Sequence, residues 1–155
     1  MNVRAAGPGD KPWIERFLGG WRDVARRGEL LRPTDHAMLI AEESGERVGL
    51  LTYVVDGDAC EILTLGATRP WSGTGTALVE AVRRVAREQG CRRLWVVTTN
   101  DNVDALRFYQ RRGFRLDTLR PGAVDEARRT LKPAIPEIGD HGISLRDEIE
   151  LVSDL

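Results

Sequence analysis

The pattern of hydrophobic and polar residues along this chain predicts both strands and helices. Runs that alternate in polarity or are continuously apolar predict strands at residues 3–6, 37–41, 47–55, 60–65, 94–97, 114–119 and 143–152. Apolar residues at intervals of three and four predict helices at residues 11–18, 74–89 and 103–112, and shorter helical segments at residues 21–27 and 123–131. Residues 28–33 are predicted to form a loop. The pattern is typical of an α/β fold.

Short polar turns connect the first strands. Glu43-Ser44-Gly45-Glu46 and Asp56-Gly57-Asp58 each contain a glycine between two β-rich runs. Three consecutive strands joined in this way predict an antiparallel meander. Before it, Asp10 is predicted to cap a helix that has Pro12 in its first turn, and Gly19-Gly20 is predicted to end that helix.

Composition narrows the class of protein. The chain has 155 residues, which suits a single domain over residues 1–155, and its net charge of −1 argues against a dedicated nucleic-acid binder. No apolar run reaches the roughly 18 residues that a membrane span needs, and the first residues lack the apolar core of a signal peptide. The two cysteines, Cys60 and Cys91, are too few for a disulfide framework or a zinc site. We expect a cytoplasmic protein with buried thiols and with no metal, membrane or nucleic-acid partner.

A glycine-containing loop joins the strand at 60–65 to the helix at 74–89. Its sequence is Arg69-Pro70-Trp71-Ser72-Gly73-Thr74-Gly75-Thr76. Glycine lets backbone approach a ligand closely, and the first turn of a helix offers N–H groups with no intrahelical acceptor. This combination suits a phosphate, although most such glycine pairs are ordinary turns. The loop lacks the Gly-Lys-Ser/Thr of a nucleotide-binding P-loop and the third glycine of a dinucleotide fingerprint.

A second motif follows one strand later, Asn102-Val103-Asp104-Ala105-Leu106-Arg107-Phe108-Tyr109-Gln110-Arg111-Arg112-Gly113-Phe114. Together the two motifs resemble the GNAT superfamily of acetyl-CoA-dependent N-acetyltransferases. That family has Arg/Gln-x-x-Gly-x-Gly/Ala at the start of a helix, then Asn-x-x-Ala-x-x-Phe-Tyr-x-x-x-Gly-Phe. The likeness is clear over residues 60–119. It implies a mixed, mostly antiparallel sheet of about seven strands flanked by about four helices.

The resemblance also implies where acetyl-CoA binds. Backbone of the strand end would pair with the pantetheine arm, the loop would hold the diphosphate, and Asn102 and Arg112 would contact the arm and the phosphates. The implied cofactor-binding residues are Leu65, Gly66, Ala67, Ser72, Gly73, Thr74, Gly75, Thr76, Asn102 and Arg112. Asn102 is also placed to cap the following helix. One position departs from the family pattern, since Pro70 stands where Arg or Gln is usual and supplies no N–H. Arg69, one position earlier, is an open substitute.

Two residues are candidates for catalysis. Simple alternation places Glu61, Leu63 and Leu65 on one face of a strand. If Glu61 is buried, desolvation would raise its pKa and suit it to act as a base near neutral pH. The alternative is a solvated carboxylate at the strand end. By resemblance, Glu61 is the general base and the Tyr109 hydroxyl assists the leaving thiolate of CoA. The alternative for Tyr109 is a core aromatic residue beside Phe108.

Other residues leave alternatives open. Trp13 and Trp21 are predicted core residues that could instead line the acceptor site. Glu148 and Glu150 could attract a cationic amine or face water. The arginines of helix 74–89 are predicted to be a solvated face, and His141 a surface residue. The long segment 120–142 could cover the acceptor pocket.

The resulting hypothesis is an N-acetyltransferase. It would move an acetyl group from acetyl-CoA to a primary amine of a small molecule or peptide, by direct attack with both substrates bound, and homodimers are a possibility that the resemblance raises. The first alternative is a non-catalytic acyl-CoA-binding or sensing module. A nucleotide-binding or phosphotransfer domain ranks last, because no carboxylate pair stands beside the loop to hold Mg²⁺.

Overall fold

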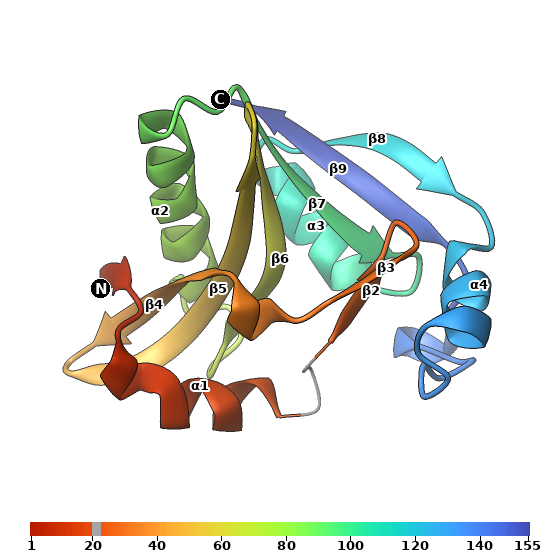
Figure 1. Ribbon diagram of the computed structural model, residues 1–155, viewed down its shortest axis with the longest axis horizontal. Helices are drawn as coiled ribbons and strands as arrows, with labels where there is room; N and C mark the ends of the chain where they lie inside the picture. The colour runs from red at the N-terminus through yellow and green to blue at the C-terminus, as the bar shows by residue number, and fades with distance from the viewer. Residues whose placement is uncertain (20–22) are drawn as a thin grey trace. The chain divides into compact units, whose positions relative to one another are not determined.

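The computed structural model describes residues 1–19 and 23–155 (Figure 1). Its strands are β1 (Asn2–Ala5), β2 (Val24–Arg26), β3 (Glu29–Leu31), β4 (Ala37–Glu43), β5 (Glu46–Asp56), β6 (Ala59–Ala67), β7 (Arg93–Thr99), β8 (Arg115–Arg120) and β9 (Glu148–Asp154). The α-helices of this part of the chain are α1 (Lys11–Leu18), α2 (Thr74–Glu88), α3 (Val103–Arg111) and α4 (Ala123–Thr130).

Seven strands form one sheet in the order β1-β4-β5-β6-β7-β9-β8, and β2 and β3 form a separate two-stranded sheet. The pairs β1–β4, β4–β5, β5–β6 and β8–β9 are antiparallel. The predicted α/β fold, with about seven strands and about four helices, is therefore confirmed. Among the described residues, no helix combines the length and the apolar character that crossing a membrane would require.

The chain contains two compact units. The first is formed by the described residues up to 19, Arg32–Leu94 and Leu155, and the second by Asp23–Leu31 and Trp95–Asp154. The first unit holds β1, β4, β5 and β6 with α1 and α2. The second holds the β2–β3 hairpin, most of β7, α3, β8, α4 and β9.

In the first unit, α1 and α2 cover opposite faces of β5 (Figure 1). A side chain at Gly49 would meet Thr74 and Leu78 of α2, so this position faces α2. The next residue, Leu50, packs instead in a core cluster with Ile14 and Leu18 of α1. Successive residues of a strand point to opposite faces. From Gly49 to the end of β5, the even-numbered residues therefore face α1 and the odd-numbered ones face α2, whereas an extra residue opposite β4 interrupts the alternation nearer the start of the strand.

The cysteines behave as predicted for buried thiols. Cys60 and Cys91 are both free and buried. Burial raises the pKa of Cys60 to about 12, and it also raises the pKa of Cys91. Both thiols therefore stay protonated near neutral pH and are poor nucleophiles.

The hairpin β2–β3 corrects two predictions. Residues 24–26 are strand, not helix, and residues 29–31 are strand, not loop. Positive φ angles at Arg27 (52°) and Gly28 (77°) make the tight turn. The Arg27 amide donates to Glu148 over 3.1 Å, and its guanidinium lies 4.9 Å from the Trp95 ring centroid. These contacts with distant parts of the chain override the local helical spacing. Trp21 lies outside the described residues.

Asp10 precedes α1, as predicted, but its side chain does not cap the helix. Its carboxylate instead accepts hydrogen bonds from Arg4 (2.7 and 2.8 Å), Arg47 (2.7 Å) and the Gly7 amide (2.7 Å). The residue is only 3% exposed. The carboxylate bonds to two guanidinium groups and not to the amides of the helix, because hydrogen bonds between ionised partners are stronger. The prediction of a capping role is therefore wrong.

The strand predicted at residues 143–152 begins only at Glu148. Upstream of it, the Asn100 side chain donates to the Ser144 carbonyl (2.7 Å) and accepts from the amides of Arg146 and Asp147 (both 3.0 Å). These bonds occupy the backbone groups that a strand would use. The helical segment predicted at residues 123–131 is confirmed as α4.

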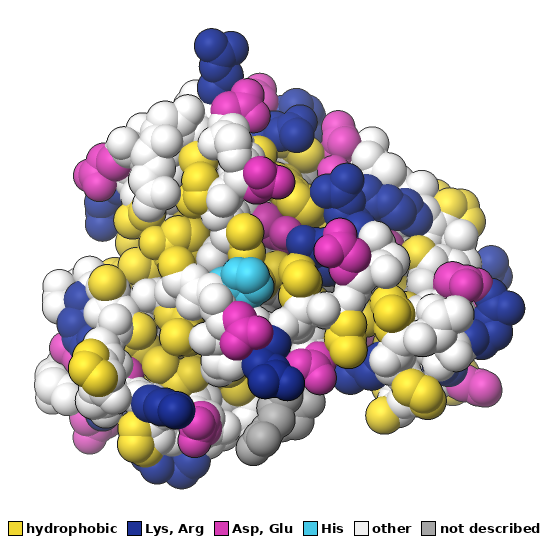
Figure 2. Space-filling model, viewed as in Figure 1, with side chains coloured by type: hydrophobic (Ala, Val, Ile, Leu, Met, Phe, Trp, Pro, Cys, Tyr) yellow, Lys and Arg dark blue, Asp and Glu magenta, His cyan; other side chains and the backbone are white. Residues whose placement is uncertain are grey.

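Basic, acidic and apolar side chains are interspersed on the face shown in Figure 2. In α2, Arg84 and Arg87 are exposed and carry the solvated face that the sequence predicted. Leu78, Val82 and Ala86 of the same helix are buried against the sheet, so the amphipathic pattern of α2 is also confirmed.

Candidate active site

The loop before α2 is a compact turn with a defined shape. The Ser72 hydroxyl donates to the Arg69 carbonyl over 2.8 Å and lies 3.0 Å from the Thr74 hydroxyl. Gly73 has a φ angle of 86° and occupies the N-cap position, and its carbonyl accepts from the Ala77 amide. Such a φ angle favours glycine, which explains the residue type here. The loop therefore ends in a well-formed helix start.

This helix start has the chemistry of an anion site. The first amides of α2 have no carbonyl one turn earlier to bond within the helix, and the helix dipole adds positive charge there. Thr74, the first residue of α2, is buried with 1% of its surface exposed, whereas the preceding Ser72 and Gly73 are exposed. The predicted diphosphate residues thus lie together at one helix terminus.

Gly49 is a further residue of this region that the sequence analysis did not identify. A Cβ atom at this position would lie 2.4 Å from Thr74 Cγ2 and 3.1 Å from the Gly66 carbonyl oxygen. Only glycine lets the first turn of α2 approach β5 so closely. A glycine inside an otherwise β-rich run is the sequence signal that could have indicated such an approach.

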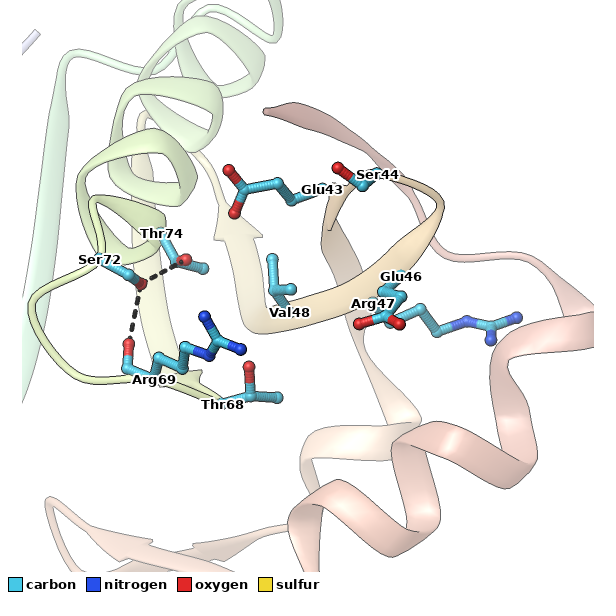
Figure 3. A pocket seen from close by; sticks show the side chains of 9 residues that line it. All are labelled: Glu43, Ser44, Glu46, Arg47, Val48, Thr68, Arg69, Ser72 and Thr74. Carbon is cyan, nitrogen blue, oxygen red and sulfur yellow. Dashed lines mark hydrogen bonds between the residues drawn. The ribbon is translucent and has the colours of Figure 1, made fainter.

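A cavity of about 460 Å³ opens beside this loop (Figure 3). It is lined by Glu43, Ser44, Glu46, Arg47, Val48, Thr68, Arg69, Ser72 and Thr74. In Figure 3 the Arg69 side chain points into the cavity, whereas the Arg47 guanidinium points away, in keeping with its bond to Asp10. The carboxylates of Glu43 and Glu46 and the guanidinium of Arg69 therefore give the cavity charged groups of both signs.

Glu61 is buried, with 3% of its surface exposed, so the solvated alternative is wrong. The predicted face is also wrong, because β6 has one extra residue opposite β5. Ile62 pairs with Tyr53 and Thr64 pairs with Thr52, which leaves Leu63 without a partner in the register. Such a bulge reverses the alternation on one side of it.

The bulge turns Glu61 toward α1. Glu61 pairs with Val54, an even-numbered residue of β5, whereas Leu65 pairs with Leu51. Paired residues share a face, so Glu61 faces α1 while Leu65 faces α2. Thr52 and Thr64, whose hydroxyls lie 2.7 Å apart, are on the same face as Glu61. Without the extra residue, the carboxylate would lie on the α2 side.

The end of β6 carries the residues predicted to meet the pantetheine arm. Leu65, Gly66 and Ala67 are half-buried, and the following Thr68 amide donates to the Val48 carbonyl over 2.8 Å. A Cβ atom at Gly66 would lie 3.0 Å from two ring atoms of Phe17. In this structure the glycine makes room for that ring, and contact with a ligand arm stays a prediction.

Trp13 and Phe17 form an aromatic pair on α1. Their rings are stacked with centroids 4.8 Å apart, and both pack against the core cluster. Both residues are only half-buried. The core role predicted for Trp13 is confirmed, and a contact with the acceptor stays a prediction.

In the second unit, Tyr109 lies on α3 with its ring between two phenylalanines. The ring centroids of Phe108 and Phe114 are both 5.1 Å away, in edge-on arrangements. Burial raises the pKa of the Tyr109 hydroxyl well above its ordinary value, so the phenol stays protonated. Within residues 1–19 and 23–155 this hydroxyl has no hydrogen-bond partner. Tyr109 therefore combines the predicted core packing with an uncommitted proton donor.

The remaining predicted residues of α3 have structural contacts of their own. The Asn102 side chain accepts from the Ala105 amide over 3.1 Å, which confirms its N-cap role. Arg112 donates to the Phe108 carbonyl over 2.8 Å and lies 3.7 Å from the Phe108 ring centroid. Burial and the neighbouring Arg111 lower the pKa of Arg112. Contacts of Asn102 and Arg112 with acetyl-CoA stay predictions.

Glu148 is buried and Glu150 is half-buried, so the alternative that both face water is wrong, whereas attraction of a cationic amine stays a prediction. Arg120 lies 2.7 Å from Glu150 and 3.7 Å from Glu148, and the Arg27 amide also bonds to Glu148. The two carboxylates are therefore neutralised within the protein. His141 is exposed and lies 3.9 Å from Asp104, in agreement with the predicted surface position.

Comparisons with known proteins identify the family of this chain. Residues 10–114 match the model of the Acetyltransferase (GNAT) family. The uncharacterized protein YdhI of Bacillus subtilis is 49% identical over 107 residues, which cover 69% of this chain and 66% of YdhI. The chain thus matches only about two thirds of the length of that relative. The uncharacterized N-acetyltransferase Rv2669 of Mycobacterium tuberculosis is 32% identical over 73% of this chain and 76% of its own.

Solved structures show the same fold. A GNAT family acetyltransferase from Elizabethkingia anophelis, solved with acetyl-CoA bound, has a TM-score of 0.71 and 22% identity, covering 99% of this chain and 97% of that one. The IAA acetyltransferase from Bacillus cereus has a TM-score of 0.70 and 21% identity, covering 99% of both chains. With the family match over most of the sequence and the two motifs in their expected elements, the chain belongs to the GNAT family of acetyltransferases.

Proposed function

We propose that this protein transfers the acetyl group of acetyl-CoA to a primary amine of a small molecule or peptide, by direct attack with both substrates bound. The observation that carries the proposal is the bulge in β6. It moves Glu61 to the face of the sheet that α1 covers, where the half-buried Trp13 and Phe17 offer an apolar wall. A buried carboxylate on such a face has the features of a general base.

In the proposed reaction the amine nitrogen attacks the thioester carbonyl carbon. A C–N bond forms, the C–S bond breaks, and Glu61 takes the proton that the nitrogen loses, through a water molecule. A main-chain N–H near Leu65–Ala67 stabilises the negative charge on the carbonyl oxygen. Tyr109 gives its proton to the departing sulfur and recovers one from solvent, so protons balance over the cycle. The buried, protonated thiols of Cys60 and Cys91 take no part.

The loop at residues 72–76 supplies binding rather than chemistry. Its helix start would hold the diphosphate of acetyl-CoA, supported by Arg69 from the adjacent cavity wall. Asn102 and Arg112 would contact the pantetheine arm and the phosphates. Fixing the donor in this way lets the amine react in an effectively unimolecular step.

The test is acetyl transfer to a panel of amino acids, polyamines, aminoglycosides and peptides, followed with radiolabelled acetyl-CoA. Tyr109→Phe keeps the ring between Phe108 and Phe114, so we expect a folded enzyme whose kcat falls about 100-fold with little change in KM for acetyl-CoA. Tyr53→Phe is the matched control, since Tyr53 is the other tyrosine of the chain and is also buried. Equal turnover of the two variants would remove Tyr109 from the chemistry.

Glu61→Gln tests the base in the same assay. We expect kcat to fall by about 100-fold near neutral pH and by less at high pH, where the amine is already deprotonated. A full-rate variant would exclude Glu61 as the base. Binding of CoA by the wild-type protein without transfer to any amine would favour the non-catalytic alternative instead.

A further inference from the structure

The turn between β4 and β5 brings two carboxylates together. Glu43 and Glu46 are paired directly across this hairpin, and paired residues share a face. Both residues are exposed, and neither carboxylate forms a hydrogen bond or an ion pair within the described part of the chain. Like charges that lie opposite one another on adjacent strands repel, so the pair destabilises the hairpin. A cation held between the two side chains would remove this repulsion.

These carboxylates line the cavity of about 460 Å³ beside the loop at residues 69–74. In Figure 3 the Glu43 carboxylate and the Arg69 guanidinium point into the cavity from opposite sides. The Arg69 carbonyl accepts from the Ser72 hydroxyl, whereas its guanidinium has no partner among residues 1–19 and 23–155. The cavity therefore has an unpaired cation on one side and unpaired carboxylates on the other.

The remaining residues of the cavity wall add no free charge. Arg47 is part of the wall, but its guanidinium bonds to Asp10 over 2.7 Å and points away from the cavity (Figure 3). The free charges are thus one guanidinium and two carboxylates, a net charge of −1. The volume falls within the roughly 300–1,000 Å³ of small-molecule pockets. The complementary ligand is a small molecule of charge +1 that carries one anionic and two cationic groups. The other lining residues, all uncharged, are Ser44, Val48, Thr68, Ser72 and Thr74.

We propose that this cavity is a second ligand site, which takes a basic amino acid such as lysine or arginine. The ligand carboxylate would pair with Arg69, and the two cationic groups would lie at Glu43 and Glu46, so that charge balances within the cavity. A guanidinium and a carboxylate can form two parallel hydrogen bonds, which gives the Arg69 side of the site its preference for a carboxylate.

The site is coupled to acetyl-CoA through Arg69. The proposed function assigns this guanidinium to the diphosphate, and the coupling rests on that assignment, whereas binding of the amino acid does not. A ligand carboxylate on Arg69 neutralises the charge that would otherwise attract the diphosphate. Lysine should therefore weaken the binding of CoA, and CoA should weaken the binding of lysine by the same factor. Such a site would make acetyl transfer sensitive to the concentration of a basic amino acid.

Calorimetric titration of the whole chain with L-lysine and with lysinamide, which lacks the carboxylate, tests the site. Exposed ion pairs each contribute little, so we expect a millimolar Kd for L-lysine and a roughly fivefold higher Kd for lysinamide. Glu43→Gln should weaken both probes about fivefold, whereas Arg69→Met should weaken L-lysine alone. Glu80→Gln and Arg84→Met, which change exposed residues of α2 outside the cavity, are the matched controls and should bind both probes normally.

Three results would overturn the site. No heat of binding from L-lysine or L-arginine at millimolar concentrations would mean that the cavity does not take such a ligand. Equal affinity of all variants for L-lysine would mean that it binds elsewhere on the protein. A loss of L-lysine binding in Glu61→Gln, with none in Glu43→Gln, would place it at the acceptor position as a substrate.

Titration of CoA in the presence of saturating L-lysine tests the coupling. We expect the Kd of CoA to rise about threefold in the wild-type protein and to stay constant in Arg69→Met. An unchanged Kd of CoA in the wild-type protein would overturn the coupling. Binding of L-lysine as expected, by a wild-type protein that does not bind CoA at all, would support the second site and contradict the proposed function instead.

Discussion

Two irregular segments of this protein are held in different ways. The loop at residues 69–74 is fixed by its own neighbours, since Ser72 bonds to Arg69 and Thr74. The segment at residues 131–147 is fixed by side chains outside it. Arg128 donates to the carbonyls of Ile135 (2.9 Å), Pro136 and Leu145 (both 2.8 Å).

Two further side chains hold the second segment from the end of β7. Asn100 bonds to residues 144, 146 and 147, and the Asp101 carboxylate accepts from the Asp140 amide over 3.0 Å. Asp101 in turn accepts from the Thr99 hydroxyl over 2.5 Å. A loop closed by local bonds leaves a short motif in the sequence, whereas one closed by distant side chains leaves none. This difference explains why the sequence indicated a defined motif for the first loop, whereas for the second segment it predicted only a long connection followed by a strand that begins too early.

Removing the Arg128 side chain should release the segment at residues 131–147, and we expect this change to lower stability more than the other substitutions in this comparison. Arg128→Ala leaves three carbonyls without their donor, and we expect it to lower the free energy of unfolding by about 3 kcal/mol. Urea unfolding followed by circular dichroism measures the change. The matched control is Arg129→Ala, because the Arg129 side chain is 71% exposed and, among the described residues, pairs only with Glu126 in the same helix. A similar loss in both variants would mean that general helix stability, and not the anchoring of the segment, is affected.

The same distinction separates the predictions that succeeded from those that failed. The strands β4 to β6, the helix α2 and the Asn102 cap depend on periodicity and on residues close in sequence, and these were predictable. The face of Glu61 was not, because a single extra residue in β6 reverses the alternation and nothing in the local sequence marks it. The β2–β3 hairpin was missed since Arg27 is positioned by Glu148 and Trp95, more than sixty residues away.

Asp10 lies between these two cases. Its position before α1 was predictable, but its carboxylate accepts hydrogen bonds from Arg4 and Arg47 and does not cap the helix. Its hydrogen bonds from Arg4, the largest cause, hold the pKa of the carboxyl well below its ordinary value. A group whose pKa is lowered on folding stabilises the protein above its ordinary pKa, and this contribution is lost as the pH falls. Since Arg4 is about one-third exposed (34%), solvent screens part of the interaction.

We therefore expect Asp10→Asn to lower the free energy of unfolding by about 2 kcal/mol at pH 7. The difference from wild type should shrink as the pH falls below about 4, the ordinary pKa of Asp. Unfolding measured at several pH values tests this, with the exposed Asp35→Asn as control. A difference that stays constant down to pH 2 would show that Asp10 stabilises the protein by shape and not by charge.

Ser72→Ala should loosen the loop at residues 69–74, and we expect it to have the smallest effect on stability. Only the hydroxyl bonds to Arg69 and Thr74 are lost, whereas Gly73 and the start of α2 remain, so we expect a loss of stability of about 1 kcal/mol or less. Affinity for CoA should fall about threefold, because the loop is less preorganised. Ser44→Ala is the control, since Ser44 lines the same cavity and its hydroxyl has no hydrogen bond within the described part of the chain. A loss of affinity beyond about thirtyfold, near 2 kcal/mol, would be too large for a hydroxyl that only holds the loop in shape. It would mean that the hydroxyl itself donates to a phosphate.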